Sequence, residues 1–416
     1  MARVCVVTAG HLSTCPRMLK AADALAEAGH RVRVVSTRFV DWATSTDEDV
    51  RRRRPGKWDW SVVDYGRQSA PVTYLRSGLR FRASRCLATS LGPRRVPLAI
   101  AARGYGRVHA ELLRLAAAEP ADFLYGGGGA LASTYVAAKR LGIPYALDLE
   151  DFHSAEQNDS PPARLAHALA ERIERAVLPQ AAFLTAASPA IARAYADTYG
   201  LRPVIINNTF PLPPMPPDLR PSPGDRLRLY WFSQTVGPDR GLEDIVRAVS
   251  LADIAAELHL RGRAIADYLD GLMRLAQEVA PTLKIVHHEP VPPDALVESC
   301  AGYDVGLAVE PGFSPNNLIA LSNKAFTYLL GGLAIVLTDT PGQRALAADV
   351  KTAAFVYTPG DALGLAVGLR RWAADTAALA RAKAAAWQAA VRRWHWEHPE
   401  DRGALLGAVE KALERA

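Results

Sequence analysis

The sequence predicts an α/β protein built from two Rossmann-like domains that face each other across a cleft. Three observations lead to this prediction. Short apolar runs alternate with amphipathic segments of helical period, which is typical of parallel sheets covered by helices. The alternation stops at one Pro-rich segment, residues 211–225, and then starts again. The length of 416 residues also exceeds what a single hydrophobic core usually holds.

The first domain is predicted over residues 1–210. Strands are expected at residues 4–8, 32–36, 123–125, 145–148, 183–186 and 204–206. Helices are expected over residues 18–28, up to residue 140 and up to residue 200. Each of these helices ends near a glycine, the residue that most often follows a helix.

The Pro-rich segment is predicted to be a linker because proline fixes φ and lacks an N–H. A second domain is predicted over residues 226–390, and residues 391–416 are predicted to pack a C-terminal helix back on the first domain. Strands are expected at residues 227–232, 256–260, 283–286, 305–309 and 353–357, with one more after the glycine pair at 331–332. Helices are expected over residues 242–251 and 268–279, followed by Ala-rich helices from about residue 363.

The composition, 49% apolar and 22% charged, is that of a soluble globular protein. No apolar run approaches the ~18 residues of a membrane span, and the start of the chain turns polar too early for a signal peptide. The four cysteines follow no disulfide or metal pattern. These features predict a cytoplasmic protein, with peripheral contact at the inner face of a membrane left open.

The net charge is +6 and arginine dominates it. Between Arg76 and Arg107, arginines are interleaved with leucines, a pattern that leaves two interpretations open. The segment is either a surface for anionic lipid or a phosphorylated ligand, or a solvated helix face. Nucleic acid is not expected as a partner because few aromatic residues stand among these arginines.

The most informative stretch is residues 322–339, which predicts a helix, a Gly-Gly stop and a buried strand. Asn323 is expected to cap the helix and Lys324 to lie in its first turn. A cation there is opposed by the helix dipole unless an anion also binds. The alternative is a lysine whose stem lies along an ordinary amphipathic helix and whose ammonium reaches solvent.

Two loops that follow strands of the second domain offer further anion ligands. Ser233, Gly237 and Arg240 are expected in the loop after residues 227–232, and residues 310–318 follow the strand 305–309. In open α/β sheets, ligands bind beyond the carboxyl ends of strands. The sequence therefore predicts a phosphate held between Arg240 and Lys324.

These residues resemble a known family, the GT-B-fold glycosyltransferases of family 4. The resemblance is carried by Asn323-Lys324-x-Phe326-x-Tyr328 followed by Gly332-x-x-x-Val336. The supporting matches are Cys15-Pro16-Arg17, Ala28-Gly29-His30-Arg31-Val32, Val204-Ile205-Ile206-Asn207-Asn208, Arg240-Gly241, Tyr303-Asp304-Val305-Gly306-Leu307 and Trp396-Glu397. Their order and spacing extend over almost the whole chain.

The resemblance implies a nucleotide-sugar donor in the second domain, an acceptor mainly in the first, retention at the anomeric carbon, and no cofactor or obligatory metal. Carried over by position, Arg240 and Lys324 would hold the donor diphosphate. The substrate-binding positions would be Gly10, His11, Arg17, Ser233, Gly237, Asn316, Asn317, Leu318, Asn323, Thr327 and, for the base, His288. The acceptor would be a glycan, a lipid-linked sugar or a small molecule.

The chain departs from the family pattern at two glutamates. The glutamate that usually holds the ribose falls at Thr327, and the earlier glutamate of the same motif falls at Ile319. These departures leave two alternatives open: an inactive relative that binds nucleotide-sugars, and a sugar-nucleotide epimerase. An epimerase would need opposed acid and base groups, which the sequence does not show clearly.

The first domain contributes a second group of candidates in the loop after residues 145–148. Glu150, Asp151 and His153 could orient the acceptor hydroxyl, and one of them could accept its proton. The leaving phosphate can serve as base in a retaining reaction, so none of them need be indispensable. Asp148 and Glu150 imitate a metal-binding Asp-x-Asp, but no metal site is predicted.

Overall fold

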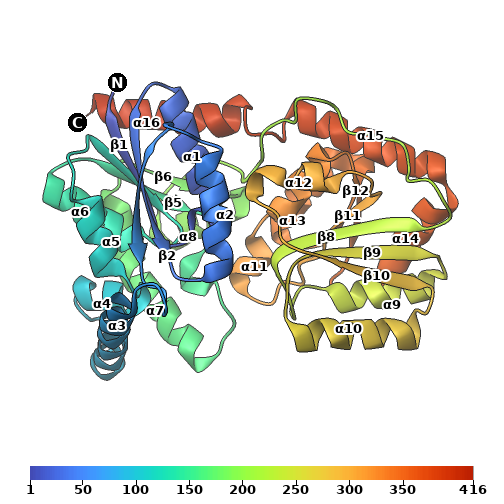
Figure 1. Ribbon diagram of the computed structural model, residues 1–416, viewed down its shortest axis with the longest axis horizontal. Coiled ribbons are helices and arrows are strands. Elements are labelled where there is room, and N and C mark those ends of the chain that lie inside the picture. Colours follow the sequence, from blue (N-terminus) through green and yellow to red (C-terminus); the bar gives the residue numbers. More distant parts are fainter. Residues whose placement is uncertain (416) are drawn as a thin grey trace. The chain divides into compact units, whose positions relative to one another are not determined.

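The computed structural model describes residues 1–415 and divides them into two compact units (Figure 1). The first unit contains Met1–Asn207, Ser314–Asn316 and the chain from Pro399 onward. The second contains Asn208–Phe313 and Asn317–His398. Each unit is thus assembled from separate stretches of the chain, and the Pro-rich segment 211–225 belongs to the second unit.

Within residues 1–415, the first unit holds a seven-stranded parallel sheet in the order β3-β2-β1-β4-β5-β6-β7. Its strands are β1 (Arg3–Thr8), β2 (Arg31–Arg38), β3 (Asp59–Asp64), β4 (Phe123–Gly127), β5 (Tyr145–Leu149), β6 (Phe183–Ala186) and β7 (Val204–Ile205). The strand order reverses at β1. Because crossovers between parallel strands are right-handed, helices of the two halves cover opposite faces of the sheet.

The helices of the first unit are α1 (Pro16–Glu27), α2 (Asp41–Arg52), α3 (Pro71–Leu91), α4 (Leu98–Tyr105), α5 (His109–Ala116), α6 (Leu131–Leu141), α7 (Pro161–Val177), α8 (Pro189–Tyr199) and α16 (Ala404–Glu414). Short helical turns lie at Leu12–Thr14, His153–Ala155, Leu178–Gln180 and Pro399–Gly403. The C-terminal helix α16 contacts α1 and β6, so the end of the chain packs on the first sheet.

Within residues 1–415, the second unit holds a six-stranded parallel sheet in the order β10-β9-β8-β11-β12-β13. Its strands are β8 (Leu227–Val236), β9 (Ala256–Ala264), β10 (Leu283–His288), β11 (Val305–Ala308), β12 (Ala334–Thr338) and β13 (Ala354–Tyr357). The order reverses between β8 and β11, which makes the carboxyl ends of these two strands the expected ligand position.

The helices of the second unit are α9 (Leu242–Ala252), α10 (Ala266–Val279), α12 (Asn323–Leu330), α13 (Pro341–Val350), α14 (Ala362–Ala374) and α15 (Thr376–Arg392). Short turns lie at Pro293–Ala295, Glu298–Cys300 and Lys351–Ala353, and α11 (Pro315–Ile319) spans the change from the first unit to the second. Helix α12 is buried from Lys324 to its end, with Phe326, Tyr328 and Leu329 fully enclosed.

The Pro-rich segment contains neither helix nor strand but has fixed contacts inside the second unit. The backbone N–H of Ser222 donates to Asp304 over 2.7 Å. A Cβ at Gly332, whose φ is +64°, would lie 2.8 Å from Pro217. The segment therefore packs against the glycine pair that follows α12 and is held by contacts within the second unit.

Helices α2, α4, α5, α7 and α13 were not among the predicted elements, and other parts of the chain also differ from the sequence-based expectations. Strand β3 was not expected, because Asp59–Asp64 begins and ends with aspartate and carries few apolar residues. Strand β8 continues to Val236 through an irregularity between Phe232 and Thr235, so Ser233 lies in a strand rather than in the loop predicted for it. The arginine-rich segment begins with the long helix α3.

Candidate active site

Two loops of the second unit meet where β8 and β11 end. Gly241 follows β8 by a short turn and has a φ of +73°, and a Cβ there would lie 2.3 Å from the carbonyl oxygen of Val309. Only glycine permits this approach, both for its conformation and for its space. The contact places the backbone of Arg240 close to that of Glu310, at the reversal point of the sheet.

Lys324 is the second residue of α12, and 9% of its side chain is exposed. Its Nζ forms an ion pair with Oε1 of Glu310 and lies 5.5 Å from the centre of the Trp231 ring. A nearly buried ammonium requires such a partner. The alternative of a lysine that reaches solvent is therefore wrong.

The helix start differs in detail from the prediction. Ser322 occupies the N-cap position and Asn323 is the first helical residue, so the prediction that Asn323 caps the helix is wrong. The Asn323 carbonyl accepts a hydrogen bond from Oγ1 of Thr327 over 3.3 Å. Thr327 is itself fully buried, so its hydroxyl already has a partner inside the helix.

The charges at this site are unevenly compensated. Glu310 neutralises Lys324, whereas the partly exposed guanidinium of Arg240 forms no hydrogen bond or ion pair with any residue from 1 to 415. Arg240 therefore carries the uncompensated positive charge beside the two loops. An anion bound at this place would be attracted by this charge and would compete with Glu310 for Lys324.

Buried polar atoms near the same strand ends also lack partners among residues 1–415. These atoms are Oε2 of Glu310, Oγ1 of Thr340, Oε1 of Gln343 and the hydroxyl of Tyr357. Gln343 is held by donating to the Ala308 carbonyl over 3.2 Å and to Oγ1 of Thr338 over 2.7 Å. Unpaired buried polar groups are rare in folded proteins, and a polar ligand is one physical reason for them.

The sequence interpretation gave no role to Glu310, Gln343 or Tyr357. Burial, and then the charges of Asp244 and Glu310, raise the pKa of the Tyr357 phenol, so its hydroxyl stays protonated and can donate. The signal that could have identified Glu310 and Tyr357 is their position at or just after the ends of β11 and β13. Neither residue belongs to a motif that the resemblance provides.

The remaining residues predicted for the donor have different surroundings. Asn317 accepts from the backbone N–H of Gly312 over 2.7 Å and so shapes the loop after β11. Leu318 packs on the same glycine and is 39% exposed. Gly237 immediately follows β8 and lies against Ile265.

His288, predicted to contact the base, lies at the end of the edge strand β10. Its Nε2 is 2.9 Å from Nδ1 of His259, and the two rings are stacked. Burial, and then the charge of Arg261, lower the pKa of His288, which favours the neutral ring. His287 binds the Gly262 carbonyl over 2.7 Å.

The first unit contains a cavity of about 520 Å³. Ala9 and Gly129, in the loops after β1 and β4, lie in its wall, so the cavity begins at the reversal point of the first sheet. Its polar lining residues include Arg85, Tyr105, His109, His153, Glu156 and Glu174. The cavity combines aromatic surface with both signs of charge, which suits a ligand that has polar and apolar parts.

His153 is the predicted candidate that lines this cavity. Its ring is buried, its Nδ1 lies 3.4 Å from Oε2 of Glu156, and its Nε2 has no partner within residues 1–415. Burial alone would lower the pKa of His153, but the hydrogen bond and charge of Glu156 outweigh it and raise the pKa to about 9. The ring is therefore protonated at neutral pH and Nε2 carries a hydrogen to donate.

Asp151 and Glu150 belong to the same loop but are not part of the cavity wall. Asn316 donates from Nδ2 to Oδ1 of Asp151 over 2.7 Å and accepts from the backbone N–H of Phe152 over 2.8 Å. Burial and the neighbouring charge of Asp151 raise the pKa of Glu150 to about 7. Asn316, predicted to bind the donor through its backbone, uses its side chain to hold this carboxylate loop.

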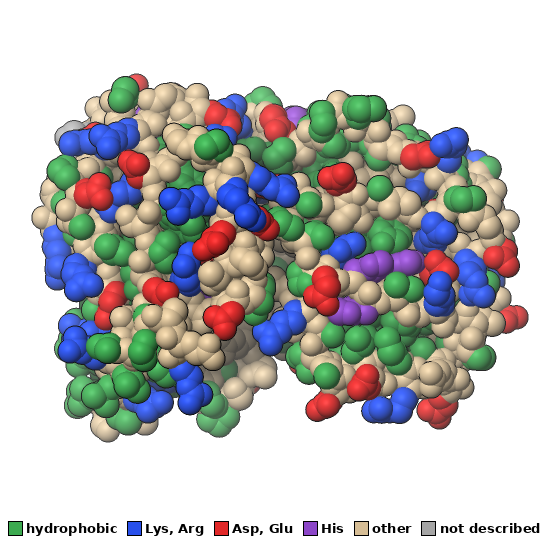
Figure 2. Space-filling model, in the orientation of Figure 1, with side chains coloured by type: hydrophobic (Ala, Val, Ile, Leu, Met, Phe, Trp, Pro, Cys, Tyr) green, Lys and Arg blue, Asp and Glu red, His purple; other side chains and the backbone are tan. Residues whose placement is uncertain are grey.

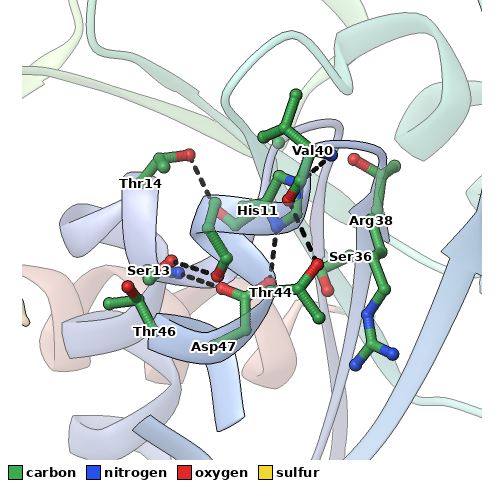
Figure 3. A network of polar contacts seen from close by, with 12 residues as sticks. His11, Ser13, Thr14, Ser36, Arg38, Val40, Thr44, Thr46 and Asp47 are labelled. Atoms are coloured by element: carbon green, nitrogen blue, oxygen red, sulfur yellow. Dashed lines mark hydrogen bonds and ion pairs between the residues drawn. The ribbon is translucent and has the colours of Figure 1, made fainter. Parts of the chain in front are cut away.

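Two predicted binding residues of the first unit serve its internal structure. Figure 3 shows the ring of His11 enclosed between the start of the chain and α2. Its Nδ1 donates to Asp47 over 2.7 Å, and its Nε2 accepts from the backbone N–H groups of Phe39 and Val40 over 3.0 and 3.1 Å. The ring is thus a neutral Nδ1–H tautomer with no free nitrogen for a ligand.

Arg17 forms a two-point ion pair with Asp148, over 2.8 Å from Nε and 2.5 Å from Nη2. Its Nη1 also donates to the Ile206 carbonyl over 2.6 Å. Burial opposes the charge of Asp148, but Arg17 outweighs it and lowers the pKa of that carboxyl. The predicted Pro-Arg motif therefore ties α1 to β5 and to the end of the first sheet.

Gly10, predicted near the donor, is confined by its surroundings: a Cβ would lie 2.8 Å from Sγ of Cys15. No group of three or more His, Cys, Asp or Glu side chains within residues 1–415 is arranged to hold a metal ion. In the same part of the chain, no helix has the length and apolar character to cross a membrane.

Comparisons with known proteins identify the architecture. Residues 16–208 match the model of the glycosyl transferase 4-like domain. This match covers most of the first unit but slightly less than half of the chain, and the predicted resemblance to family 4 glycosyltransferases and the predicted fold are confirmed. A search of curated proteins gave no match.

Solved GT-B structures share the fold along the whole chain. HepE of Anabaena, in complex with UDP and glucose, is 16% identical with a TM-score of 0.67, and 100% of both chains is covered. Sucrose-phosphate synthase of Thermosynechococcus elongatus is 15% identical with a TM-score of 0.67 and the same coverage. A glycosyltransferase of Rickettsia africae is 12% identical, with a TM-score of 0.63 over 99% of this chain and 98% of its own.

Proposed function

We propose that this glycosyltransferase moves a sugar from a nucleotide-sugar to an acceptor bound in the cavity of the first unit. The proposed reaction retains the anomeric configuration and needs no metal ion. UDP-glucose is the first donor to test, because HepE was solved with UDP-glucose as well as with UDP and glucose. The acceptor is a glycan, a lipid-linked sugar or a small molecule.

The observation that carries the proposal is the pair of cations, Arg240 and Lys324, near the ends of β8 and β11. Among residues 1–415 Arg240 is a cation without a partner and Lys324 is a nearly buried one, and both lie by the loop that begins at Val309. The backbone N–H groups at the start of α12 add partial positive charge. This arrangement suits a diphosphate better than a neutral ligand.

The same groups would act during bond breaking. As the bond between the anomeric carbon and the diphosphate opens, negative charge grows on the leaving phosphate, and cations held in place stabilise that charge more than the charge of the ground state. Glu310 keeps the Lys324 ammonium at the site before the donor arrives. Removing a single such donor typically costs 10²–10³-fold in turnover.

In the first unit, the cavity would hold the acceptor and His153 would orient it. The protonated ring can donate from Nε2 to an acceptor oxygen. Because the ring carries the proton, His153 does not serve as the base, and the leaving phosphate accepts the proton of the attacking hydroxyl. Asp151, fixed by Asn316, would position the loop that carries His153.

The test measures binding and turnover of a panel of nucleotide-sugars. A ligand present at about a hundred times its Kd should raise the free energy of unfolding by about 2.7 kcal/mol, which a thermal-shift screen detects. Release of the nucleoside diphosphate should depend on the acceptor and persist with a chelator. If no nucleotide-sugar binds, or none is consumed with any acceptor, the proposal is wrong.

A second candidate function is a nucleotide-sugar-binding protein without turnover. It is favoured by Thr327 and Ile319, which stand where the family has glutamates, and by the complete burial of Thr327. Calorimetry combined with product analysis separates the two candidates. Binding without product in the presence of an acceptor extract would favour the second.

A further inference from the structure

Helix α3 of the first unit has its apolar side chains on the outside. Its buried positions are small or polar: Ser77, Gly78, Ser84 and Ala88. Its exposed positions include Val72 (59%), Leu75 (68%), Leu79 (70%), Leu87 (48%) and Leu91 (58%). The spacing of three and four residues places the first three on one face. A surface helix of a globular protein normally has the opposite arrangement.

The charges on this helix have one sign. Between Pro71 and Leu91 there are four arginines and no acidic residue, and Arg94 and Arg95 follow. Arg80 pairs with Glu111, and Arg94 with Glu171. The exposed side chains of Arg76, Arg82 and Arg95 form no hydrogen bond or ion pair within residues 1–415. Apolar and basic side chains lie next to one another at the lower left of Figure 2, where Figure 1 draws α3.

We propose that this face of α3 docks on an anionic membrane surface. Leucine side chains would enter the boundary between head groups and acyl chains, and the flanking guanidinium groups would meet lipid phosphates. A second copy of the chain is a poorer occupant. Two such faces would bring unpaired arginines together, and α3 offers no carboxylate to compensate them.

The inner side of the same helix faces the cavity. Phe81 and Arg85 line it, and Arg107, also in its wall, donates to the Tyr74 carbonyl over 2.6 Å and to Oγ of Ser77 over 3.2 Å. Helix α3 therefore separates the docking face from the cavity. If the proposed transferase function holds, the acceptor is an amphiphile presented at the membrane, with its polar head in the cavity.

The test is co-sedimentation of the full chain with phosphatidylcholine vesicles that contain either no anionic lipid or about one third phosphatidylglycerol. Binding should require the anionic lipid and should weaken at about 0.5 M salt, where the Debye length is short. The L75S/L79S variant should lower partitioning at least about tenfold, since burial of each leucine contributes that order. The R76E/R82E variant should lower it by at least about 25-fold, at about fivefold for each cation.

Matched controls come from the second unit. L363S/V367S changes an exposed apolar pair with the same spacing on α14, and R274E/R371E changes two exposed arginines without partners in residues 1–415. Both controls should bind vesicles like the unchanged protein. All variants alter exposed side chains, so each should keep its melting temperature.

Three outcomes would overturn the proposal. They are no binding of the unchanged protein to anionic vesicles, equal losses in the α3 variants and their controls, and a dimer that is disrupted by L75S/L79S in the absence of vesicle binding. Donor binding in solution is measured for the same variants. Docking with no nucleotide-sugar bound would defeat the proposed function alone, and donor turnover without docking would defeat only this inference.

Discussion

Replacing Lys324 tests whether its charge serves a ligand or only neutralises Glu310. The K324M variant keeps an apolar stem next to Trp231 but removes the ammonium. Glu310, with 13% of its side chain exposed, then loses its only ion-pair partner within residues 1–415. Breaking a fully buried pair from one side costs about 3–5 kcal/mol. Because both side chains retain some solvent contact, we expect a loss of about 2–4 kcal/mol.

The double variant K324M/E310Q separates the two roles. Glutamine keeps the shape of Glu310 without its charge, so the double variant should regain most of the lost stability, to within about 1 kcal/mol of the unchanged protein. Sugar transfer should stay about 10²–10³-fold lower, because the cation that stabilises the leaving diphosphate is still absent. The E310Q variant alone should bind the donor at least as tightly as the unchanged protein, since Lys324 is then free to bind phosphate.

The assay combines urea unfolding of the four proteins with turnover at saturating donor. The four unfolding free energies form a double-mutant cycle that gives the coupling between Lys324 and Glu310. Recovery of both stability and transfer in K324M/E310Q would refute the reasoning, because Lys324 would then only compensate a carboxylate. Full activity in K324M alone would refute it as well.

Three further predictions concern the same unit and its neighbour. R240Q should weaken nucleotide-sugar binding about 10–100-fold by calorimetry without a change in melting temperature, because Arg240 has no partner within residues 1–415; unchanged affinity would remove it from the site. G241A should lower stability by at least about 1 kcal/mol and weaken donor binding, since alanine is strained at this φ and would press on Val309; an unchanged melting temperature would contradict this. E150Q should stabilise the protein by about 1–2 kcal/mol at pH 8 but little near pH 4.5. Because the pKa of Glu150 is raised in the folded protein, its contribution to folding stability is full below its ordinary pKa of 4.5 and is lost as the pH rises through about 7. Urea unfolding across this range should show that the stability difference between E150Q and the unchanged protein grows with pH. A difference that stays constant would contradict this prediction.

The fold was predictable because its signals are local. Apolar runs such as Val4–Thr8 and Leu227–Phe232 are buried on both faces of parallel sheets, and such runs stand out in a sequence. Strand β3 was not predictable, because it begins and ends with aspartate and pairs with β2 alone. The orientation of α3 was also beyond the sequence, since only tertiary packing decides which face of a helix is covered.

The candidate site was predictable only at residues that lie in a motif of the resemblance and also carry a charge suited to a phosphate. Arg240 was predicted because it follows a strand, and Lys324 because a cation in the first turn of a helix suggests a bound anion, whereas Glu310 was missed because its role depends on a residue fourteen positions away. Ion pairing between distant positions leaves no periodic signal in a sequence. For Glu310 and Tyr357 the one signal present in the sequence is a position at or just after the end of a strand.

Residues that a family motif marks can serve the scaffold instead of the ligand. His11 and Arg17 both matched positions expected to bind substrate, yet their polar atoms are used inside the first unit, by Asp47 and by Asp148. His11 holds the loop after β1, and Arg17 holds Asp148 within β5, near the carboxyl ends of strands, where ligands bind in open α/β sheets. Replacing them would therefore lower activity through displaced loops and lost stability together. A change at Arg240, which has no such partner in the described part of the chain, should lower donor affinity alone, and this difference distinguishes a positioning residue from a binding one.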